Sequence, residues 1–112
     1  MSVEKWSDTV VVVHLANDPQ FTDELQDLDR HSSEHGRPHA VLDFSTVDTI
    51  NSSNLARLLK IRKQALQAGR RLLFCNVGSH VLNTLLVTGL DNVFDISQDV
   101  STALATLQLA RS

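Results

Sequence analysis

Two adjacent serines, Ser52 and Ser53, follow an apolar stretch at residues 40–44 and a short polar turn, and they precede a helical pattern over residues 55–68. Hydroxyls at a helix N-terminus lie beside backbone N–H groups that have no partner within the helix, and the helix dipole adds positive potential there. Such a position favours an anion, including a phosphate on the hydroxyl itself. Ser52 is therefore a candidate phosphorylation switch, but the residues alone favour the alternative, a purely structural capping or first-turn hydroxyl.

The residues around the serines have expected structural roles. Asn51 is a good capping residue for the helix, and Ser53 is expected to be a structural residue of the first turn. Two acids precede the pair, Asp43 and Asp48. They are expected to satisfy backbone N–H groups of the turn.

A second chemical pattern lies upstream: His31, Glu34 and His35 match the H-x-x-E-H arrangement of inverted zincins. Histidines four residues apart share one helix face and can both bind zinc, with the glutamate as a base. However, Gly36 and Pro38 end the helix at once, and 112 residues leave little room for a protease cleft. The two histidines are interpreted as solvated helix-end residues, and a zinc-dependent hydrolase remains a remote alternative.

The rest of the sequence offers no further catalytic signature. No G-x-S-x-G elbow surrounds a serine, and neither a P-loop nor a dinucleotide fingerprint is present. The single cysteine, Cys75, ends an apolar run, which indicates a buried and inert thiol in a reducing compartment. No apolar run is long enough to span a membrane. We expect no catalysis, no cofactor, no bound metal and no signal peptide.

Charge is distributed unevenly along the chain. The net charge is −3, yet residues 49–90 contain no acid and carry +6, which leaves −9 for the remainder. The acids gather around the first predicted helix, and the cations follow the serines: Arg57, Lys60, Arg62, Lys63, Arg70 and Arg71. These cations either meet an acidic protein partner or complement the helix dipole and solvate its outer face. Nucleic acid is disfavoured, because the whole domain is acidic and no aromatics alternate with the basic residues.

The elements that position the serines alternate between strand and helix patterns. Strands are predicted at residues 3–6, 10–15, 40–44, 72–77 and 93–96. Between them we expect a helix capped by Thr22, one over residues 52–68, one over residues 79–86, and a last one opened by Ser97 or Asp99. The pattern predicts one α/β domain over residues 1–112: a small mixed sheet with mostly parallel inner strands, an antiparallel N-terminal edge and about four helices.

In the order and spacing of these segments the chain resembles the STAS family, the sulfate-transporter and anti-sigma factor antagonist domains. Residues 41–55 resemble the family's signature strand, turn and Asp-Ser-Ser-Gly loop, and residues 68–77, 88–96 and 103–107 resemble its later segments. The resemblance implies a regulator that acts by protein–protein binding. It also implies that a dedicated kinase phosphorylates Ser52, that phosphorylation releases the partner, and that a phosphatase restores binding.

Two positions depart from the family pattern: Asn51 replaces the usual acid and Asn54 the usual glycine. Asn51 keeps the capping ability but removes a charge from the region that the kinase meets. Asn54 adds a side chain where the backbone of a partner would approach. The loop over residues 16–21 also lacks the family's usual glycine and is shortened.

The combined prediction is a cytoplasmic anti-sigma factor antagonist controlled by phosphorylation of Ser52. Its partners would be an anti-sigma factor with serine-kinase activity and a phosphatase, with no direct nucleic-acid binding and no membrane insertion. The expected docking surface is the serine loop and the outer face of the next helix: Thr49, Asn51, Ser53, Asn54, Arg57 and Lys60. Two alternatives stay open: a STAS subunit of a lipid-transporting ABC complex, and a scaffold subunit of a stress-sensing assembly.

Overall fold

The computed structural model describes residues 3–110, without the side chains of Ser33, His35, Leu109 and Ala110. Five strands form one sheet in the order β1, β2, β3, β4, β5, with bounds Val3–Lys5, Val10–Ala16, His39–Thr46, Leu72–Cys75 and Asp95–Ser97. The edge strand β1 runs antiparallel to β2, and the other neighbouring strands pair in parallel. The predicted mixed sheet with an antiparallel N-terminal edge is confirmed.

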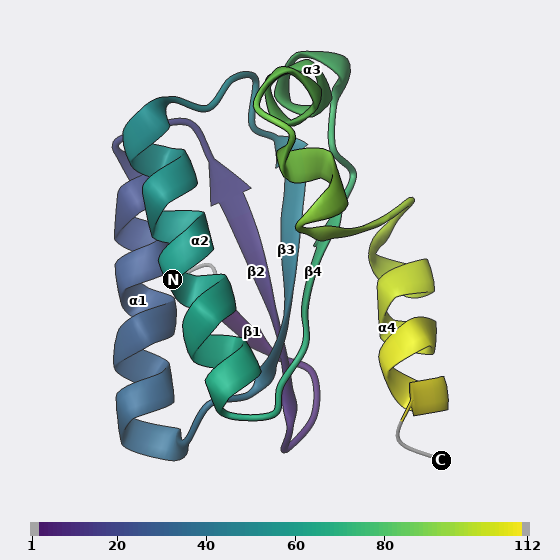
Figure 1. Ribbon diagram of the computed structural model, residues 1–112. Helices are drawn as coiled ribbons and strands as arrows, with labels where there is room; N and C mark the ends of the chain where they lie inside the picture. The colour runs from purple at the N-terminus through teal and green to yellow at the C-terminus, as the bar shows by residue number, and fades with distance from the viewer. Residues whose placement is uncertain (1–2, 111–112) are drawn as a thin grey trace.

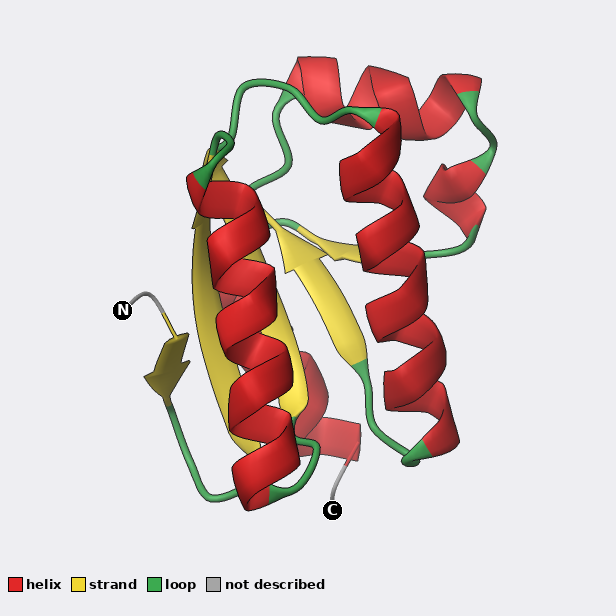
Figure 2. Cartoon of the chain, turned by 90° about the vertical axis from the view of Figure 1, so that its left-hand side faces the viewer, coloured by secondary structure: helices red, strands yellow, loops and turns green. Residues whose placement is uncertain are grey.

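In the described part of the chain, the helices are α1 (Gln20–His35), α2 (Ser52–Gln67), α3 (Ser79–Val87) and α4 (Val100–Ala110), with a short 3-10 helix, η1 (Leu90–Asn92). α1 and α2 lie side by side over one face of the sheet, and α4 covers part of the other (Figures 1 and 2). α3 lies across the end of the sheet at which β3 and β4 finish, near the start of α2. None of the described helices is long and apolar enough to cross a membrane.

Alternating side chains of the strands build two separate cores. Beneath α1 and α2, phenylalanine rings form a row with centroid separations of 6.2 Å (Phe21–Phe44), 4.8 Å (Phe44–Phe74) and 4.5 Å (Phe74–Phe94). On the opposite face, α4 contributes to a second cluster: Val10, Val12, Val41, Leu73, Cys75, Ala103 and Leu107. β3 and β4 are therefore buried on both faces, as their continuous apolar runs predict.

The caps of two helices refine the sequence-based expectation. α1 begins before Thr22, so the predicted capping role of Thr22 is wrong. Instead, the Asp18 carboxylate accepts hydrogen bonds from the Thr22 N–H (3.1 Å) and hydroxyl (2.8 Å). This arrangement satisfies a free donor and complements the positive end of the helix dipole. At α4, Asp99 rather than Ser97 opens the helix, since Asp99 accepts from the Thr102 N–H (2.8 Å).

The strand boundaries also differ from the prediction by one or two residues, and two of these differences have a local cause. β4 stops before Asn76, because Asn76 adopts a left-handed conformation with φ of 54° that no strand accommodates. β5 begins at Asp95 rather than at residue 93. The Leu90 carbonyl accepts the N–H groups of Val93 (3.0 Å) and Phe94 (3.2 Å), and these bonds continue the turn of η1. The chain therefore enters β5 two residues later than its apolar residues indicate.

Candidate functional site

Ser52 and Ser53 form the first turn of α2, at the edge of the sheet where the parallel strands end (Figure 1). Two apolar residues of the preceding loop, Val47 and Ile50, are buried in the main core and hold the loop in place. Both serine side chains are exposed, and within the described residues neither hydroxyl makes a hydrogen bond. The structure thus places two free hydroxyls at a helix N-terminus, where the sequence locates them.

A pair of asparagines caps this helix. Asn51 Oδ1 accepts from the Asn54 N–H (2.8 Å), and Asn54 Oδ1 accepts from the Asn51 N–H (3.0 Å). The Leu55 N–H donates to the Asn51 carbonyl (3.0 Å), which leaves the N–H groups of Ser52 and Ser53 as the free donors of the first turn. The predicted capping role of Asn51 is confirmed, and the free donors give this end of the helix a positive potential that suits an anion.

Asn54 lies differently from the expectation. Only 4% of the residue is exposed, and its side-chain amide donates to Asp18 Oδ2 (3.0 Å) while its oxygen serves the cap. The idea that Asn54 adds a side chain at the surface that a partner meets is therefore wrong. The side chain turns inward because its amide and oxygen both find partners there. Asn54 ties the start of α2 to the β2–α1 loop.

The β2–α1 loop braces the serine loop at a second point. Asn17 donates from its side-chain amide to Asp48 Oδ2 (2.9 Å), and its side-chain oxygen accepts from the Asp48 N–H (2.9 Å). Asp48 thus bonds a side chain, not the backbone N–H group expected from the sequence. A hollow of about 250 Å³ lies between the two loops, lined by Asn17, Asp18, Thr49, Ile50, Asn51 and Asn54. Sequence reasoning treated residues 17–19 only as a turn and missed their place in the site.

The carboxylate of Asp18 is held ionised beside this loop. The hydrogen bond from Asn54 lowers the pKa of Asp18 below its ordinary value, and the bond from Thr22 acts in the same direction. A negative charge of the chain's own therefore lies next to the cap of α2, where it accepts from the Asn54 amide (3.0 Å) and where the Asn51 side chain also lowers the pKa of Asp18. Ser52 itself has no such carboxylate bonded to it within the described residues.

Asp43 sets the turn that leads out of β3. Its Oδ1 accepts from the Ser45 N–H (3.0 Å) and from the Asn76 amide (3.0 Å), and its Oδ2 contacts His14 Nδ1 (2.8 Å). Burial raises the pKa of Asp43, but the bonds from Asn76, His14 and Ser45 outweigh it and lower the pKa overall. The imidazole of His14 also contacts Glu4 (3.1 Å), and its pKa is raised by Asp43 and then by Glu4. The predicted role of Asp43 as an acceptor for turn N–H groups is confirmed.

The six cations of the acid-free stretch divide into two groups. Arg62 donates to the Val93 carbonyl (2.9 Å), Arg70 donates to the Arg37 carbonyl (3.0 Å), and Arg71 pairs with Asp95 (3.6 Å). These three side chains therefore stabilise loops. The other three project into solvent from α2 and carry unneutralised charge on its outer surface: Arg57, Lys60 and Lys63. Of these three, Arg57 and Lys60 lie nearer to the start of α2.

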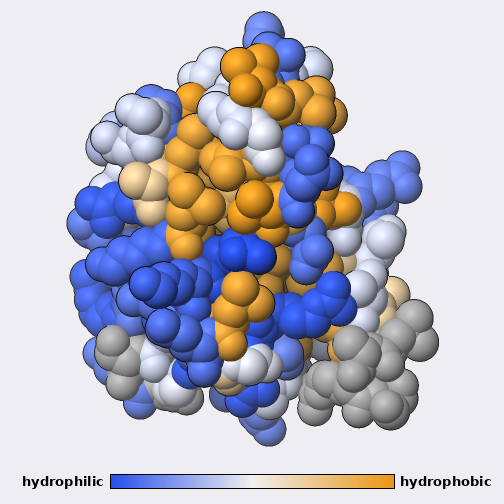
Figure 3. All heavy atoms as spheres, in the orientation of Figure 1, coloured by the Kyte–Doolittle hydropathy of each residue, from blue (hydrophilic) through white to orange (hydrophobic). Residues whose placement is uncertain are grey.

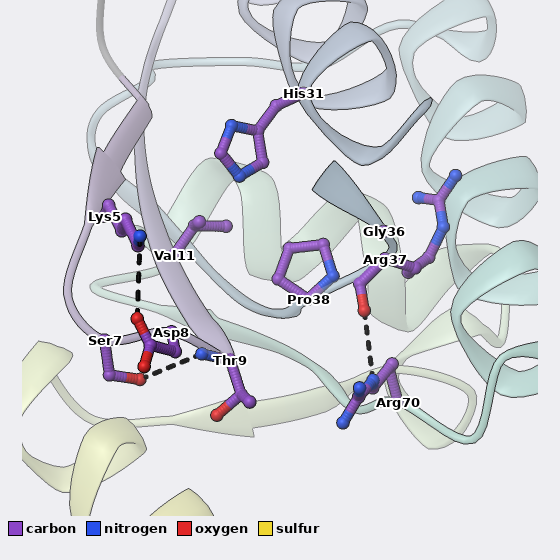
Figure 4. Close-up of a pocket in the computed structure, with 10 residues that line it drawn as sticks. All are labelled: Lys5, Ser7, Asp8, Thr9, Val11, His31, Gly36, Arg37, Pro38 and Arg70. Carbon is purple, nitrogen blue, oxygen red and sulfur yellow. Dashed lines mark hydrogen bonds and ion pairs between the residues drawn. The ribbon is translucent and has the colours of Figure 1, made fainter. Parts of the chain in front are cut away.

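The histidine motif lies at the opposite end of the molecule from Ser52. Figure 4 shows His31 above a hollow of about 330 Å³ whose polar groups bond one another: Lys5 pairs with Asp8 (3.6 Å) and Arg70 with the Arg37 carbonyl. Among the described side chains no three His, Cys, Asp or Glu groups are close enough to hold a metal ion. His35 has no described side chain, so the structure provides no support for the zinc alternative.

The thiol of Cys75, which the sequence predicts to be buried and inert, lies in the core beneath α4. The thiol is fully buried against α4 and donates weakly to the Leu42 carbonyl (3.7 Å). Burial raises its pKa to about 12, and the charges of Asp43 and Asp99 add to the effect. The predicted burial of the thiol is therefore confirmed, and the setting agrees with an inert thiol, because reactive cysteines require an exposed, cationic one.

Comparisons with known proteins agree with this geometry. The BtrV protein of Bordetella bronchiseptica, named as a candidate anti-sigma factor antagonist, is 28% identical over 99 residues, which cover 88% of this chain and 82% of that protein. A serine-to-glutamate variant of RsbS from Moorella thermoacetica matches with a TM-score of 0.78 at 19% identity, over 100% of both chains. Phosphorylated SpoIIAA of Bacillus matches with a TM-score of 0.72 at 12% identity, over 94% of this chain and 96% of that one. The two structures support the fold. The family model described as "STAS domain" matches residues 8–103, and the chain therefore belongs to the STAS domain family.

Proposed function

We propose that this chain is a cytoplasmic anti-sigma factor antagonist that binds its protein partner while Ser52 is unmodified and releases it when Ser52 is phosphorylated. The observation that supports this most directly is the exposed Ser52 hydroxyl beside free backbone N–H groups at a helix N-terminus with a neutral cap. A relative that matches most of the chain is itself named as a candidate anti-sigma factor antagonist.

The free donors at the start of α2 explain why the fold tolerates a phosphate. Phosphoserine adds up to two negative charges, and these favour the positive end of a helix dipole. A partner interface built over a neutral hydroxyl does not tolerate the same dianion, because repulsion and desolvation then oppose binding. The modification therefore changes the affinity for the partner without unfolding the domain.

The partner in this proposal is an anti-sigma factor that also acts as the serine kinase, and a phosphatase restores the hydroxyl. The docking surface contains the exposed side chains around Ser52: Thr49, Asn51, Ser53, Arg57 and Lys60. The chain itself performs no catalysis in this scheme. Its role is to occupy the anti-sigma factor, and Ser52 decides when it does so.

The test begins with the native partner. The tagged protein is purified from its own cells, copurifying proteins are identified, and phosphate is mapped on the bound and free pools. We expect an anti-sigma kinase in the bound pool and Ser52 phosphate only in the free pool. An ABC ATPase with unmodified Ser52 in both pools would instead support the transporter-subunit alternative.

Variants then separate the switch from the fold. With the purified partner, Ser52→Asp should weaken binding at least about 10-fold by calorimetry, while Ser52→Ala and the neighbouring control Ser53→Ala should bind as the wild type does. A tenfold change in affinity corresponds to about 1.4 kcal/mol. Equal binding by Ser52→Asp and Ser52→Ala rejects the switch and leaves the fold untouched.

A further inference from the structure

Large apolar side chains that reach solvent are concentrated on two elements. Seven such residues are exposed in the described part of the chain, and five of them lie on α2 and α3. We call these five the apolar strip: Leu59 (38% exposed), Leu66 (56%), Leu82 (36%), Leu86 (53%) and Val87 (79%). Figure 3 shows apolar residues gathered over α3 at the top of the molecule and continuing downward beside α2, with hydrophilic residues next to them.

The fold of the chain does not account for this exposure. α3 buries Val81 and Leu85 completely, and these two residues suffice to attach the helix to the core. Leu82 and Leu86, one position further along, form a second apolar row on the outside. A surface helix normally carries polar residues on its outer face, and contiguous exposed apolar patches in monomeric proteins mark interaction sites.

A hollow beside Leu66 extends the strip toward β5. It measures about 150 Å³, and the residues that line it include the apolar side chains of Ala65, Leu66, Leu72 and Val93. Its polar lining consists of three arginines and one acid: Arg62, Arg70, Arg71 and Asp95. Asp95 is paired with Arg71 (3.6 Å), so the rim keeps an excess of positive charge. An apolar side chain flanked by carboxylates fits this hollow better than one flanked by cations.

The geometry points to one occupant. We propose that the apolar strip binds an amphipathic helix of a partner protein, with leucine-like side chains on one face and Asp or Glu along its flanks. Leu59 and Leu66 are seven residues apart, about 10.5 Å along α2, and present a ridge of the kind that packs against another helix. The acidic flank follows from charge complementarity, because Lys63, four residues after Leu59 and three before Leu66, borders the ridge, and Lys60 lies beside it, in a stretch without any acid.

This inference rests on the proposed function and gives it an electrostatic cause. Ser52 begins the helix that carries Leu59 and Leu66, so a phosphate there adds negative charge at one end of the strip. An acidic helix seated on the strip is repelled by that charge, whereas a basic or neutral one is not. The same surface thereby supplies both the affinity and the sensitivity to phosphorylation.

The test uses a designed 18-residue helical peptide with leucine on one face and glutamate on both flanks, and a second peptide in which lysine replaces every glutamate. Each is titrated into the full chain, unmodified, with methyl NMR as the readout. We expect the glutamate peptide to shift the methyl signals of the strip and to bind at least about 10-fold more tightly than the lysine peptide. Equal affinities, or shifts confined to other methyl groups, overturn the proposal.

Two variants match the strip against a control. Leu86→Ser combined with Val87→Ser should weaken the glutamate peptide about 10-fold, while Trp6→Ser removes a similarly exposed side chain (48%) outside the strip and should change nothing. Equal losses in both variants overturn the proposal. If the strip variant loses self-association in sedimentation equilibrium and not peptide binding, the occupant is a second copy of the chain, and the proposal is wrong.

The proposed function and the docking of an acidic helix can fail independently of each other, and the experiments distinguish the two failures. The peptide titration requires neither kinase nor phosphate, so its failure leaves the Ser52 switch intact. Conversely, if Ser52→Asp does not affect the native partner while the glutamate peptide still binds the strip, the switch is rejected and the docking surface remains. If Ser52→Asp releases the native partner yet leaves glutamate-peptide affinity unchanged, the electrostatic link between them is overturned.

Discussion

α1 and α2 are both sixteen residues long and lie side by side on the same face of the sheet, but they differ at their N-termini and on their outer surfaces (Figure 2). At the start of α1, the Asp18 carboxylate accepts the Thr22 N–H. At the start of α2, the capping side chain is the neutral Asn51, and two N–H groups remain free. The Asp18 carboxylate thus bonds a backbone N–H of the first helix, whereas at the second helix it reaches only the side chain of Asn54 and leaves the two N–H groups unbonded.

The outer surfaces of the two helices repeat the contrast. α1 carries five of the thirteen acids and exposes no large apolar residue within its described side chains, whereas α2 carries Arg57, Lys60 and Lys63 and exposes Leu59 and Leu66. A solvated acidic surface serves solubility. A basic surface with exposed leucines beside an unfilled anion position is suited to a regulated contact. The comparison therefore favours α2 over α1 as the helix that carries the proposed docking surface.

The largest expected effects concern the inner faces, where the two helices should be equivalent. Leu28 of α1 and Leu58 of α2 are 1% and 0% exposed in the same core. Leu28→Ala and Leu58→Ala should each lower the free energy of unfolding by about 2–5 kcal/mol, because each leaves a cavity. Urea unfolding measures both. A loss below about 1 kcal/mol in only one of them would show that the two helices are not packed alike.

The burial of the inner faces of α1 and α2 is also the feature that the sequence predicts best. The spacing of Leu25 and Leu28 in α1, and of Leu58 and Ile61 in α2, follows from burial against one sheet. The exposure of Leu82 and Leu86 does not follow, because an apolar row looks the same in sequence whether the fold covers it or not. The helical pattern therefore predicts the position of α3 correctly, but it does not show that one apolar face of α3 stays uncovered.

The caps should give the next largest effect. Asn51→Ala removes the acceptor for the Asn54 N–H and should cost about 1 kcal/mol of unfolding free energy. Asn54→Ala removes the reciprocal bond and the contact with Asp18. Because the two side chains act as one unit, the double variant should lose at least about 0.5 kcal/mol less than the sum of the single losses. Strict additivity in urea unfolding would contradict the reciprocal cap.

The parts of the site that the sequence could not predict depend on contacts between distant segments. Asp18 and Asn54 are separated by 36 residues, and Asn17 and Asp48 by 31. Local turn chemistry indicates a turn at residues 17–19, but it carries no information on which loop that turn will meet. Asn54 illustrates the same limit: its difference from the family glycine is visible in the sequence, while its inward orientation depends on the position of Asp18.

The stability that Asp18 contributes at the start of α1 depends on pH, and this effect should be smaller than that of the caps. The folded state lowers the pKa of Asp18, so its ionised form contributes stability above the unfolded pKa of about 3.8 and loses it as the pH falls through the lower folded value. Asp18→Asn should flatten this part of the profile below about pH 4, and the difference is small because the side chain is exposed. Urea midpoints between pH 2.5 and 7 measure it, and parallel profiles for both proteins would refute the assignment.

The smallest expected effect on stability comes from making the same change of charge once on α1 and once on α2. The same two variants give the sharpest test of the outer surfaces. Lys60→Glu on α2 and Arg30→Glu on α1 each change the net charge by −2 at an exposed position. Both should alter the free energy of unfolding by no more than about 1 kcal/mol, because exposed charges are screened and the Arg30–Asp27 pair is a surface ion pair. Association with the glutamate-flanked peptide should nevertheless slow only for Lys60→Glu, and the difference should shrink as salt is added. Stopped-flow mixing at two ionic strengths measures this. An equal slowing by both variants would mean that the net charge of the domain, rather than the surface of α2, attracts the partner.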